Sequence, residues 1–316
     1  MFLASGAVVL GFVLLILGGD LLVRGAEKLA AKLHLTPAVI GLTIVAFGTS
    51  VPELVVSLMA ALGGNPDIAL GNVVGSNILN ITLVMGVTSL LIPLTVQQDL
   101  VRIHGPFMFL LTCLLVLFAW DLGLSRFEGA FLFILLIIFT VWMIRRTRVA
   151  QKAQSHENQV DASVSLMRPM LNVGVGIVLL WGGGKTALWG AVELATLWGL
   201  TERVIALTIV ALGTSMPELV ASVVSILRKQ NDIALGNIVG SNIYNIGCVL
   251  GLTSFLTPIR VDPQIITTDV WMMLGAALFF LVVAFIFRSM TRWSGVVYVL
   301  ALSIYMLWLL HPSTFG

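Results

Sequence analysis

Uninterrupted apolar runs constrain the fold of this chain more than any other feature of its sequence. Runs of about 20 apolar residues are long enough to cross the hydrocarbon core of a bilayer as helices. Such runs follow one another almost from end to end of the 316 residues. Only 10% of the residues are charged, whereas soluble domains carry about 25%. The sequence therefore predicts an all-α polytopic membrane protein.

The apolar runs divide into ten predicted transmembrane helices. These are expected at residues 4–26, 37–62, 68–93, 103–120, 127–146, 170–195, 203–227, 233–258, 269–288 and 293–311. The first run leads straight into Asp20 and Arg24, so we expect it to be a retained helix rather than a cleaved signal. Cys113 and Cys248 lie inside apolar runs, which indicates neither a disulfide framework nor a metal cluster.

A polar stretch at residues 147–168 divides the chain into two units of five predicted helices, residues 1–146 and 169–316. Basic residues are enriched in cytoplasmic loops. With the polar stretch as a cytoplasmic linker, its side of the membrane carries thirteen Lys and Arg residues, against three on the other side. We therefore expect a multi-pass protein of the cell membrane, plasma or inner, with both termini outside.

An internal repeat relates the two units. Residues 41–81 align without a gap with residues 206–246, and 27 of the 41 positions are identical. This degree of identity indicates a duplication. Because each unit has an odd number of predicted helices, the second copy enters the membrane from the opposite side. The sequence thus predicts two inverted five-helix repeats, an architecture that suits alternating access around a site at the midplane.

Each copy of the repeat carries polar residues at helical spacing within apolar sequence. In the first copy Thr49, Glu53 and Ser57 are four residues apart, which puts them on one face of a helix. The next helix repeats this spacing with Asn72, Ser76 and Asn80. The counterparts in the second copy are Thr214, Glu218, Ser222, Asn237, Ser241 and Asn245.

A proline interrupts the first helix of each copy, at Pro52 and Pro217. Proline has no N–H to donate and its ring clashes with the preceding turn, so we expect a bend there with freed carbonyls upstream. Irregular backbone survives at membrane depth only where it lines a cavity or is buried in protein. This predicts broken helices at the centre of the molecule.

The two glutamates need a positive partner in this setting. A central acidic residue costs about 2.5–3.5 kcal/mol on insertion scales, and neither pair of repeat helices contains a basic residue in its interior. Carboxylate, hydroxyl, amide and carbonyl oxygens are hard ligands that suit Na⁺, Ca²⁺, Mg²⁺ or protons. For Glu53 and Glu218 a bound cation is therefore the favoured interpretation.

Other polar and small residues of the repeats have simpler interpretations. A single Ser, Thr or Asn in a membrane helix usually hydrogen-bonds a neighbouring helix. The GxxxG pairs, Gly71 with Gly75 and Gly236 with Gly240, indicate close helix packing. Asp232, like its counterpart Asp67, is expected to cap the N-terminus of the following helix.

These motifs resemble a known family. GTSVPEL with GNVVGSNILNI, and GTSMPEL with GNIVGSNIYNI, are similar to the two α-repeats of the sodium/calcium exchangers in the cation/calcium antiporter superfamily. The resemblance covers essentially the whole chain. It implies ion coordination by the second, third, seventh and eighth spans and sliding of the first and sixth spans as the gating motion. The residues it implies as ligands are Ala46 and Ala211, through their carbonyls, with Thr49, Ser50, Glu53, Ser76, Asn80, Thr214, Ser215, Glu218, Ser241 and Asn245.

The resemblance also implies a function, secondary active exchange of about three Na⁺ for each Ca²⁺. Some relatives carry an aspartate where this chain has Asn245, and an acid in this region is associated with K⁺ transport, so Asn245 argues for K⁺ independence. The proton/calcium branch resembles G-N-x-x-E, whereas this chain has Thr-Ser-x-Pro-Glu, which favours Na⁺ as coupling ion.

Several alternatives stay open on the sequence alone. An H⁺-coupled or K⁺-coupled Ca²⁺ antiporter keeps the same site with another driving ion, and a cation channel is disfavoured by an inverted repeat around one central site. An enzyme is not expected, because the sequence has no Ser/His or Cys/His set and no HExxH motif. The expected partners are Na⁺, Ca²⁺ and the lipid bilayer, with no cofactor and no nucleic acid, and we expect the protein to work as a monomer.

Overall fold

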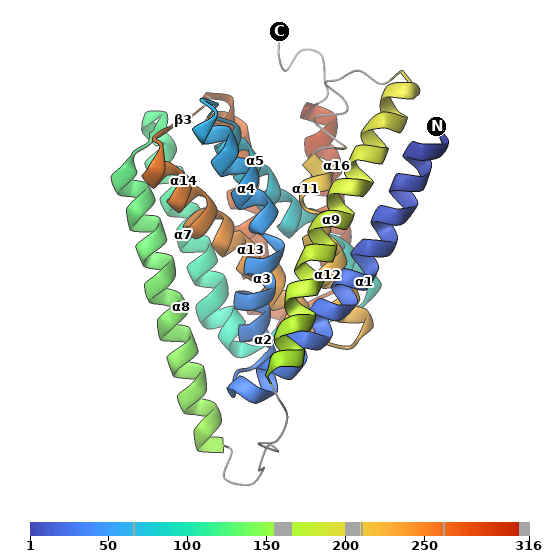
Figure 1. Cartoon of the computed structure of the whole chain (residues 1–316). Coiled ribbons are helices and arrows are strands. Elements are labelled where there is room, and N and C mark those ends of the chain that lie inside the picture. Colours follow the sequence, from blue (N-terminus) through green and yellow to red (C-terminus); the bar gives the residue numbers. More distant parts are fainter. Residues whose placement is uncertain (66, 155–165, 200–208, 210, 262, 310–316) are drawn as a thin grey trace.

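A computed structural model describes the chain apart from residues 66, 155–165, 200–208, 210, 262 and 310–316 (Figure 1). The described part is a helical bundle with four two-residue strands. The elements of the first half are α1 (Phe2–Leu33), α2 (Pro37–Ile40), η1 (Gly41–Val45), α3 (Ala46–Thr49), α4 (Val51–Leu62), α5 (Asp67–Leu79), η2 (Asn80–Val84), α6 (Met85–Leu91), β1 (Leu94–Thr95), η3 (Leu100–His104), α7 (Gly105–Phe118), η4 (Ala119–Asp121), β2 (Gly123–Leu124) and α8 (Arg126–Gln154).

The second half repeats this order of elements. Its described elements are α9 (Met167–Leu197), α11 (Ala211–Thr214), α12 (Met216–Leu227), α13 (Asn231–Tyr244), η6 (Asn245–Leu250), α14 (Gly251–Leu256), β3 (Ile259–Arg260), η7 (Ile265–Asp269), α15 (Val270–Phe287), β4 (Ser289–Met290) and α16 (Arg292–Leu309). The offset of 165 residues seen in the repeat motifs relates β1 to β3 and η3 to η7 without change. The duplication therefore extends well beyond residues 41–81.

Nine of the ten predicted helices are recovered in the described part of the chain. Eight helices there are long and apolar enough to cross a membrane, and a ninth is a bent pair, Pro37–Thr49 with Val51–Leu62. The predicted helix at 203–227 lies partly outside the described residues; the rest of it forms α11 and α12. The structure is thus that of an all-helical, multi-pass membrane protein.

The chain direction reverses between the halves. Figure 1 shows that α1 begins and α16 ends toward one end of the bundle, whereas α8 ends and α9 begins toward the other. Two short antiparallel sheets join the halves, β1 with β4 and β2 with β3. Each sheet pairs a strand of the first half with a strand of the second, so the two halves exchange equivalent contacts.

The helices that carry the repeat motifs occupy the centre of the bundle. In the most apolar window of Asn231–Leu256 94% of the residues are buried, and in that of Ile68–Leu91 72% are buried, against 28% for Arg126–Gln151. Polar groups are costly in contact with hydrocarbon. Burial of α13 and α5 against other helices keeps their polar residues away from lipid.

The predicted helix breaks are present in both halves. Ser50 separates α3 from α4 with φ −85° and ψ 2°, and Ser215 separates α11 from α12 with nearly the same angles, −90° and 6°. The bend in the first half is 42°. Because Pro52 and Pro217 cannot donate to the preceding turn, each helix restarts one residue before its proline.

The GxxxG prediction is confirmed for Gly236 and Gly240 of α13, whereas no described atom of another element lies within 3.8 Å of a Cβ added at Gly71 or Gly75 of α5. A Cβ added at Gly240 would come within 2.6 Å of both the Ala46 Cβ and the Leu42 carbonyl oxygen. The backbone of α13 therefore lies directly against η1 and α3, as small residues at this spacing allow.

The N-cap prediction for Asp232 is wrong. The N-cap of α13 is Gln230, which places Asp232 inside the first turn of the helix, where its carboxylate accepts a hydrogen bond from Gln97 at 2.5 Å. The side chain of Asp67 lies outside the described residues.

Helices α1 and α9 lie side by side along one flank of the bundle (Figure 1). Small residues recur every seven positions along their contact, at Gly11, Gly18 and Gly25 on α1 and Gly176, Gly183 and Gly190 on α9. A Cβ at Gly183 would lie 2.8 Å from the Gly11 carbonyl oxygen. The two backbones therefore touch over most of their length.

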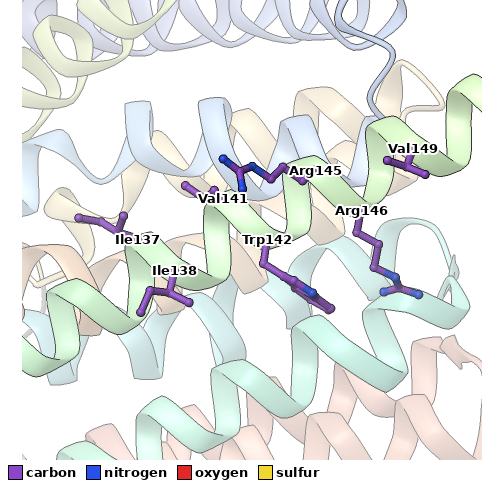
Figure 2. Close-up of a pocket in the computed structure, with 7 residues that line it drawn as sticks. All are labelled: Ile137, Ile138, Val141, Trp142, Arg145, Arg146 and Val149. Carbon is purple, nitrogen blue, oxygen red and sulfur yellow. The ribbon is translucent and has the colours of Figure 1, made fainter.

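A pocket on α8 is distinct from the buried centre (Figure 2). It is lined by Ile137, Ile138, Val141, Trp142, Arg145, Arg146 and Val149. Arg146 lies 5.5 Å from the centre of the Trp142 ring and 3.3 Å from the Asp99 carboxylate. Since no acidic side chain lines this pocket and two arginines do, it does not suit a cation.

Candidate ion-binding site

The two helix breaks direct the two glutamates into the centre of the protein. Glu53 lies in the first turn of α4 and Glu218 in the first turn of α12, and each has 0% of its surface exposed. The N-terminus of a helix carries a partial positive charge that favours a nearby anion. Ser50, three residues before Glu53, contacts the Glu218 carboxylate. Both carboxylates therefore belong to one buried site.

Hydrogen bonds across the repeats assemble this site. The Ser50 hydroxyl donates to Glu218 Oε1 at 3.3 Å. The Thr49 hydroxyl lies 3.2 Å from Asn237 Oδ1 and 3.4 Å from the Ser241 hydroxyl oxygen. Residues of the first motif thus meet residues of the second motif, as inverted copies around a common centre would.

Asn72 hydrogen-bonds α5 to α4, and Asn237 hydrogen-bonds α13 to α12. Asn72 donates to the Glu53 carbonyl at 3.3 Å and to the Ser57 hydroxyl at 3.0 Å. Asn237 makes the same two bonds, at 3.4 Å to the Glu218 carbonyl and 2.9 Å to the Ser222 hydroxyl. These asparagines hold the backbone of each glutamate in place and leave its carboxylate free.

Many buried polar atoms around the glutamates have no hydrogen-bond partner in the described part of the chain. They are both carboxylate oxygens of Glu53, Oε2 of Glu218, the hydroxyls of Ser76 and Ser215, both amide atoms of Asn80 and Oδ1 of Asn245. An unpaired buried polar group costs about 1–3 kcal/mol, and a charged one more. Among these atoms the Asn80 amide nitrogen only donates, the two hydroxyls can donate or accept, and the carboxylate and amide oxygens accept. The set therefore fits a cation.

The positive charge is not supplied by a side chain among the described residues. The described ion pairs involve Asp20 with Arg24 and Arg228, and Asp99 with Arg146. Lys185 lies over the Trp181 ring at 5.0 Å. The described residues also contain no cluster of three or more His, Cys, Asp or Glu side chains placed to hold a metal ion together. A ligand set of two carboxylates with neutral oxygens is typical of hard cations.

The structure places the remaining predicted ligands near this centre to different extents. Ser76 is buried on α5, and its hydroxyl has no hydrogen-bond partner among the described residues. Thr214 ends α11 and is half-buried, and the side chain of Ala211 lies outside the described residues. The Ala46 carbonyl is not freed as predicted, because it accepts from the Ser50 N–H at 3.0 Å and the Thr49 hydroxyl at 3.2 Å. Binding an ion there requires the Thr49 hydroxyl to turn away.

Two buried asparagines beside the site are absent from the predicted ligand set. Asn77 accepts a hydrogen bond from the Asn245 amide at 3.0 Å and donates to the Asn242 carbonyl at 3.4 Å. Both residues lie off the polar stripes at four-residue spacing. The signal that could have identified them is the Ser-Asn pair, which recurs as Ser76-Asn77 and Ser241-Asn242.

Known proteins resemble this chain over most of its length. The chain is 34% identical to inner membrane protein YrbG of Escherichia coli, over 89% of this chain and 88% of that protein. It is 30% identical to sodium/calcium exchanger MaX1 of Methanosarcina acetivorans, over 91% and 93%. A solved structure of the sodium-calcium exchanger NCX_Mj superposes with a TM-score of 0.84 at 28% identity, covering 97% of this chain and 98% of that one.

A family model described as "Sodium/calcium exchanger protein" matches the chain twice, once in each half, at residues 3–145 and 169–311. The two matches span almost all of the two halves of the chain on either side of residues 147–168. Each contains one of the glutamate motifs that meet at the buried site. The chain therefore belongs to the sodium/calcium exchanger family of antiporters.

Proposed function

We propose that this protein exchanges Na⁺ for Ca²⁺ across the cell membrane, with about three Na⁺ for each Ca²⁺. The observation that carries the proposal is the pair of fully buried carboxylates, three of whose four oxygens lack donors among the described residues. The ligands are the carbonyls of Ala46 and Ala211 with the side chains of Thr49, Ser50, Glu53, Ser76, Asn80, Thr214, Ser215, Glu218, Ser241 and Asn245.

The charge of the site accounts for competition between the two cargoes. Two carboxylates neutralise one Ca²⁺, and the same oxygens can instead share several Na⁺. Because both loads use overlapping ligands, binding of one excludes the other. An exchange of three Na⁺ for one Ca²⁺ moves one net charge, worth about 2.3 kcal/mol per 100 mV of membrane potential.

We infer ten transmembrane helices in two inverted repeats, working by alternating access. The 165-residue offset between equivalent elements and the reversed chain direction support the inverted arrangement. Alternating access is supported by a difference between α1 and α9 in how they contact the central helices. Gly19 of α1 lies against Val220 and Val224 of α12, whereas its counterpart Gly184 lies against Pro217 of the same region.

This inequality is what one of two related states requires. In the opposite state, α9 takes the place on α4 that α1 now has on α12, and the other face of the site opens. We place the linker of residues 147–168 in the cytoplasm and both termini outside, because the linker side carries most of the Lys and Arg residues. The protein acts as a monomer and needs no cofactor.

Transport in proteoliposomes tests the proposal. The purified protein should take up Ca²⁺ when an outward Na⁺ gradient is imposed, and Glu53→Gln should reduce this uptake to the level of empty vesicles. A matched control is Glu128→Gln, which changes a half-buried glutamate that bonds Ser125 at the start of α8, away from the two motifs, and should leave uptake within about twofold. Wild-type uptake by Glu53→Gln would refute the site.

The same vesicles distinguish the rival functions. If an H⁺ or K⁺ gradient drives Ca²⁺ uptake in the absence of Na⁺, the coupling ion is H⁺ or K⁺ and not Na⁺. Downhill Ca²⁺ flux without any counter-ion would identify a channel. Asn245 in place of an acid supports K⁺ independence, and a valinomycin-clamped potential that speeds or slows uptake according to its sign would establish the net charge moved.

A further inference from the structure

Asn77 is a buried residue outside the proposed ligand set. Its side chain is 1% exposed and lies between two residues of the second repeat. Asn77 Oδ1 accepts from Asn245 Nδ2 at 3.0 Å, and Asn77 Nδ2 donates to the backbone carbonyl of Asn242 at 3.4 Å. The Asn77 amide of the first repeat thus bonds Asn245, a proposed ligand of the second repeat.

The backbone carbonyl determines the direction of this chain of hydrogen bonds. A carbonyl oxygen can only accept, so Asn77 must present its NH₂ group to Asn242. Its own oxygen then faces Asn245, which must in turn present its NH₂ group. The Asn245 oxygen is left over, buried and without a donor among the described residues. Asn77 therefore fixes Asn245 with its oxygen available to the site.

The counterpart positions lack this arrangement. Asn80 is related to Asn245 by the repeat, and both of its amide atoms have no partner in the described part of the chain. Asn242 is related to Asn77, but it donates to the Ile238 carbonyl of its own helix at 2.7 Å. Only one of the two amide ligands is therefore held in a fixed orientation.

We propose that Asn77 is a positioning residue that fixes the Asn245 amide as an oxygen ligand and thereby suits position 245 to a neutral amide. A carboxylate at position 245 would turn an acceptor toward the Asn77 oxygen, and Asn77 could turn its NH₂ group to it only by placing its oxygen against the Asn242 carbonyl. This inference rests on the proposed exchange function, and it explains how the site keeps two negative charges.

The KM for Ca²⁺ in Na⁺-driven uptake tests the inference in reconstituted full-length protein. Asn77→Ala should raise the KM about tenfold, the factor expected when the orientation of one ligand is lost, with the maximal rate within about twofold. Asn77→Ser keeps an oxygen that can accept from Asn245 and should recover part of the affinity. Asn242→Ala is the matched control, because it retains the backbone carbonyl and should leave the KM within about twofold.

A double-mutant cycle separates positioning from a general loss of structure. Asn245→Ala removes the amide that Asn77 holds, so adding Asn77→Ala to it should raise the KM by much less than tenfold. Multiplicative effects of the two changes, or a wild-type KM in Asn77→Ala, would overturn the inference while leaving Na⁺/Ca²⁺ exchange intact. Absence of Na⁺-driven uptake by the wild type would instead overturn the proposed function and this inference with it.

If Asn77→Ala does not yield a monodisperse protein, Asn77→Ser carries the test. Its KM should then lie above that of the wild type, because a shorter side chain cannot bond Asn245 and the Asn242 carbonyl together. A KM equal to that of the wild type would overturn the inference. Ca²⁺-dependent thermal stabilisation of the same variants gives a second measure of affinity that does not depend on transport.

Discussion

Asn237 makes three hydrogen bonds within the site through its side chain. It donates to the Glu218 carbonyl and the Ser222 hydroxyl and lies within bonding distance of the Thr49 hydroxyl. Asn237→Ala leaves these buried groups unpaired, so we expect the free energy of unfolding to fall by about 1–3 kcal/mol. Thermal unfolding in detergent measures the change.

An exposed hydrogen bond provides the control. Ser303→Ala removes a bond from an exposed hydroxyl to the carbonyl one turn earlier in α16, and it should change stability by no more than about 0.5 kcal/mol. Equal losses in the two variants would show that Asn237 contributes no more than an ordinary surface residue.

The sequence predicts single residues of the site well where spacing carries the signal. Glu53 and Glu218 are identifiable because a carboxylate within apolar sequence needs a partner, and both prove to be buried. Asn77 is not identifiable in this way, since its role depends on a contact with Asn245, far away along the chain. The sequence also does not reveal that the Ala46 carbonyl already accepts a hydrogen bond, because this depends on the orientation of the Thr49 hydroxyl.

At the scale of elements, the close contact between α1 and α9 depends on glycines. A Cβ at Gly183 would lie 2.8 Å from both the Gly11 carbonyl oxygen and the Leu15 nitrogen, so the backbones must separate to admit it. We expect Gly183→Ala to lower stability by about 1–3 kcal/mol. The adjacent Gly182 has nothing within 4 Å of an added Cβ.

Gly182→Ala is therefore the matched control for Gly183→Ala. It should leave stability unchanged or raise it by up to about 1 kcal/mol, because alanine is the better helix former. Unfolding temperatures of the two variants, measured side by side, test the contact. A loss in Gly182→Ala equal to that in Gly183→Ala would mean that the contact of Gly183 with α1 does not account for its loss of stability.

Element boundaries show where sequence reasoning succeeds and where it stops. The breaks at Ser50 and Ser215 follow from the prolines two residues later, a local cause that the sequence displays. The π-helical segments η2 and η6 do not have such a signal, although they begin at the proposed ligands Asn80 and Asn245. A π-helical turn is stabilised by tertiary packing around it, and packing is not visible in local sequence.

At the scale of the whole molecule, one ion pair should distinguish the two states of the proposed alternating-access cycle. Arg228, at the end of α12, bonds the Asp20 carboxylate of α1 through Nε at 2.6 Å and through a second nitrogen. The repeat places Lys185 and Gly63 at the counterpart positions, which cannot form an equivalent pair. The ion pair should therefore stabilise the state described here and have no equivalent in the opposite one.

Disulfide trapping reads out the two states. An added Cβ at Gly19 lies 3.4 Å from a Val220 methyl carbon, so cysteines at these positions should crosslink in the present state. Their counterparts are Gly184 and Val55, and Val55 is 37% exposed here. Cysteines at positions 184 and 55 should crosslink only in the opposite state, and each crosslink should stop Ca²⁺ uptake until a reductant is added. Replacing Cys113 and Cys248 by serine first removes competing thiols.

Arg228→Ala should shift the populations of the two states away from the one described here, because it removes the ion pair with Asp20. Without the guanidinium, crosslinking of positions 19 and 220 should slow and crosslinking of positions 184 and 55 should accelerate, each by a few-fold, since a partly exposed ion pair contributes at most about 1 kcal/mol. Lys229→Ala removes a neighbouring charge that makes no described ion pair and should leave both rates unchanged. Equal slowing of the two crosslinks by Arg228→Ala would indicate a general loss of packing, and unchanged rates would show that Asp20 and Arg228 do not bias the exchange cycle.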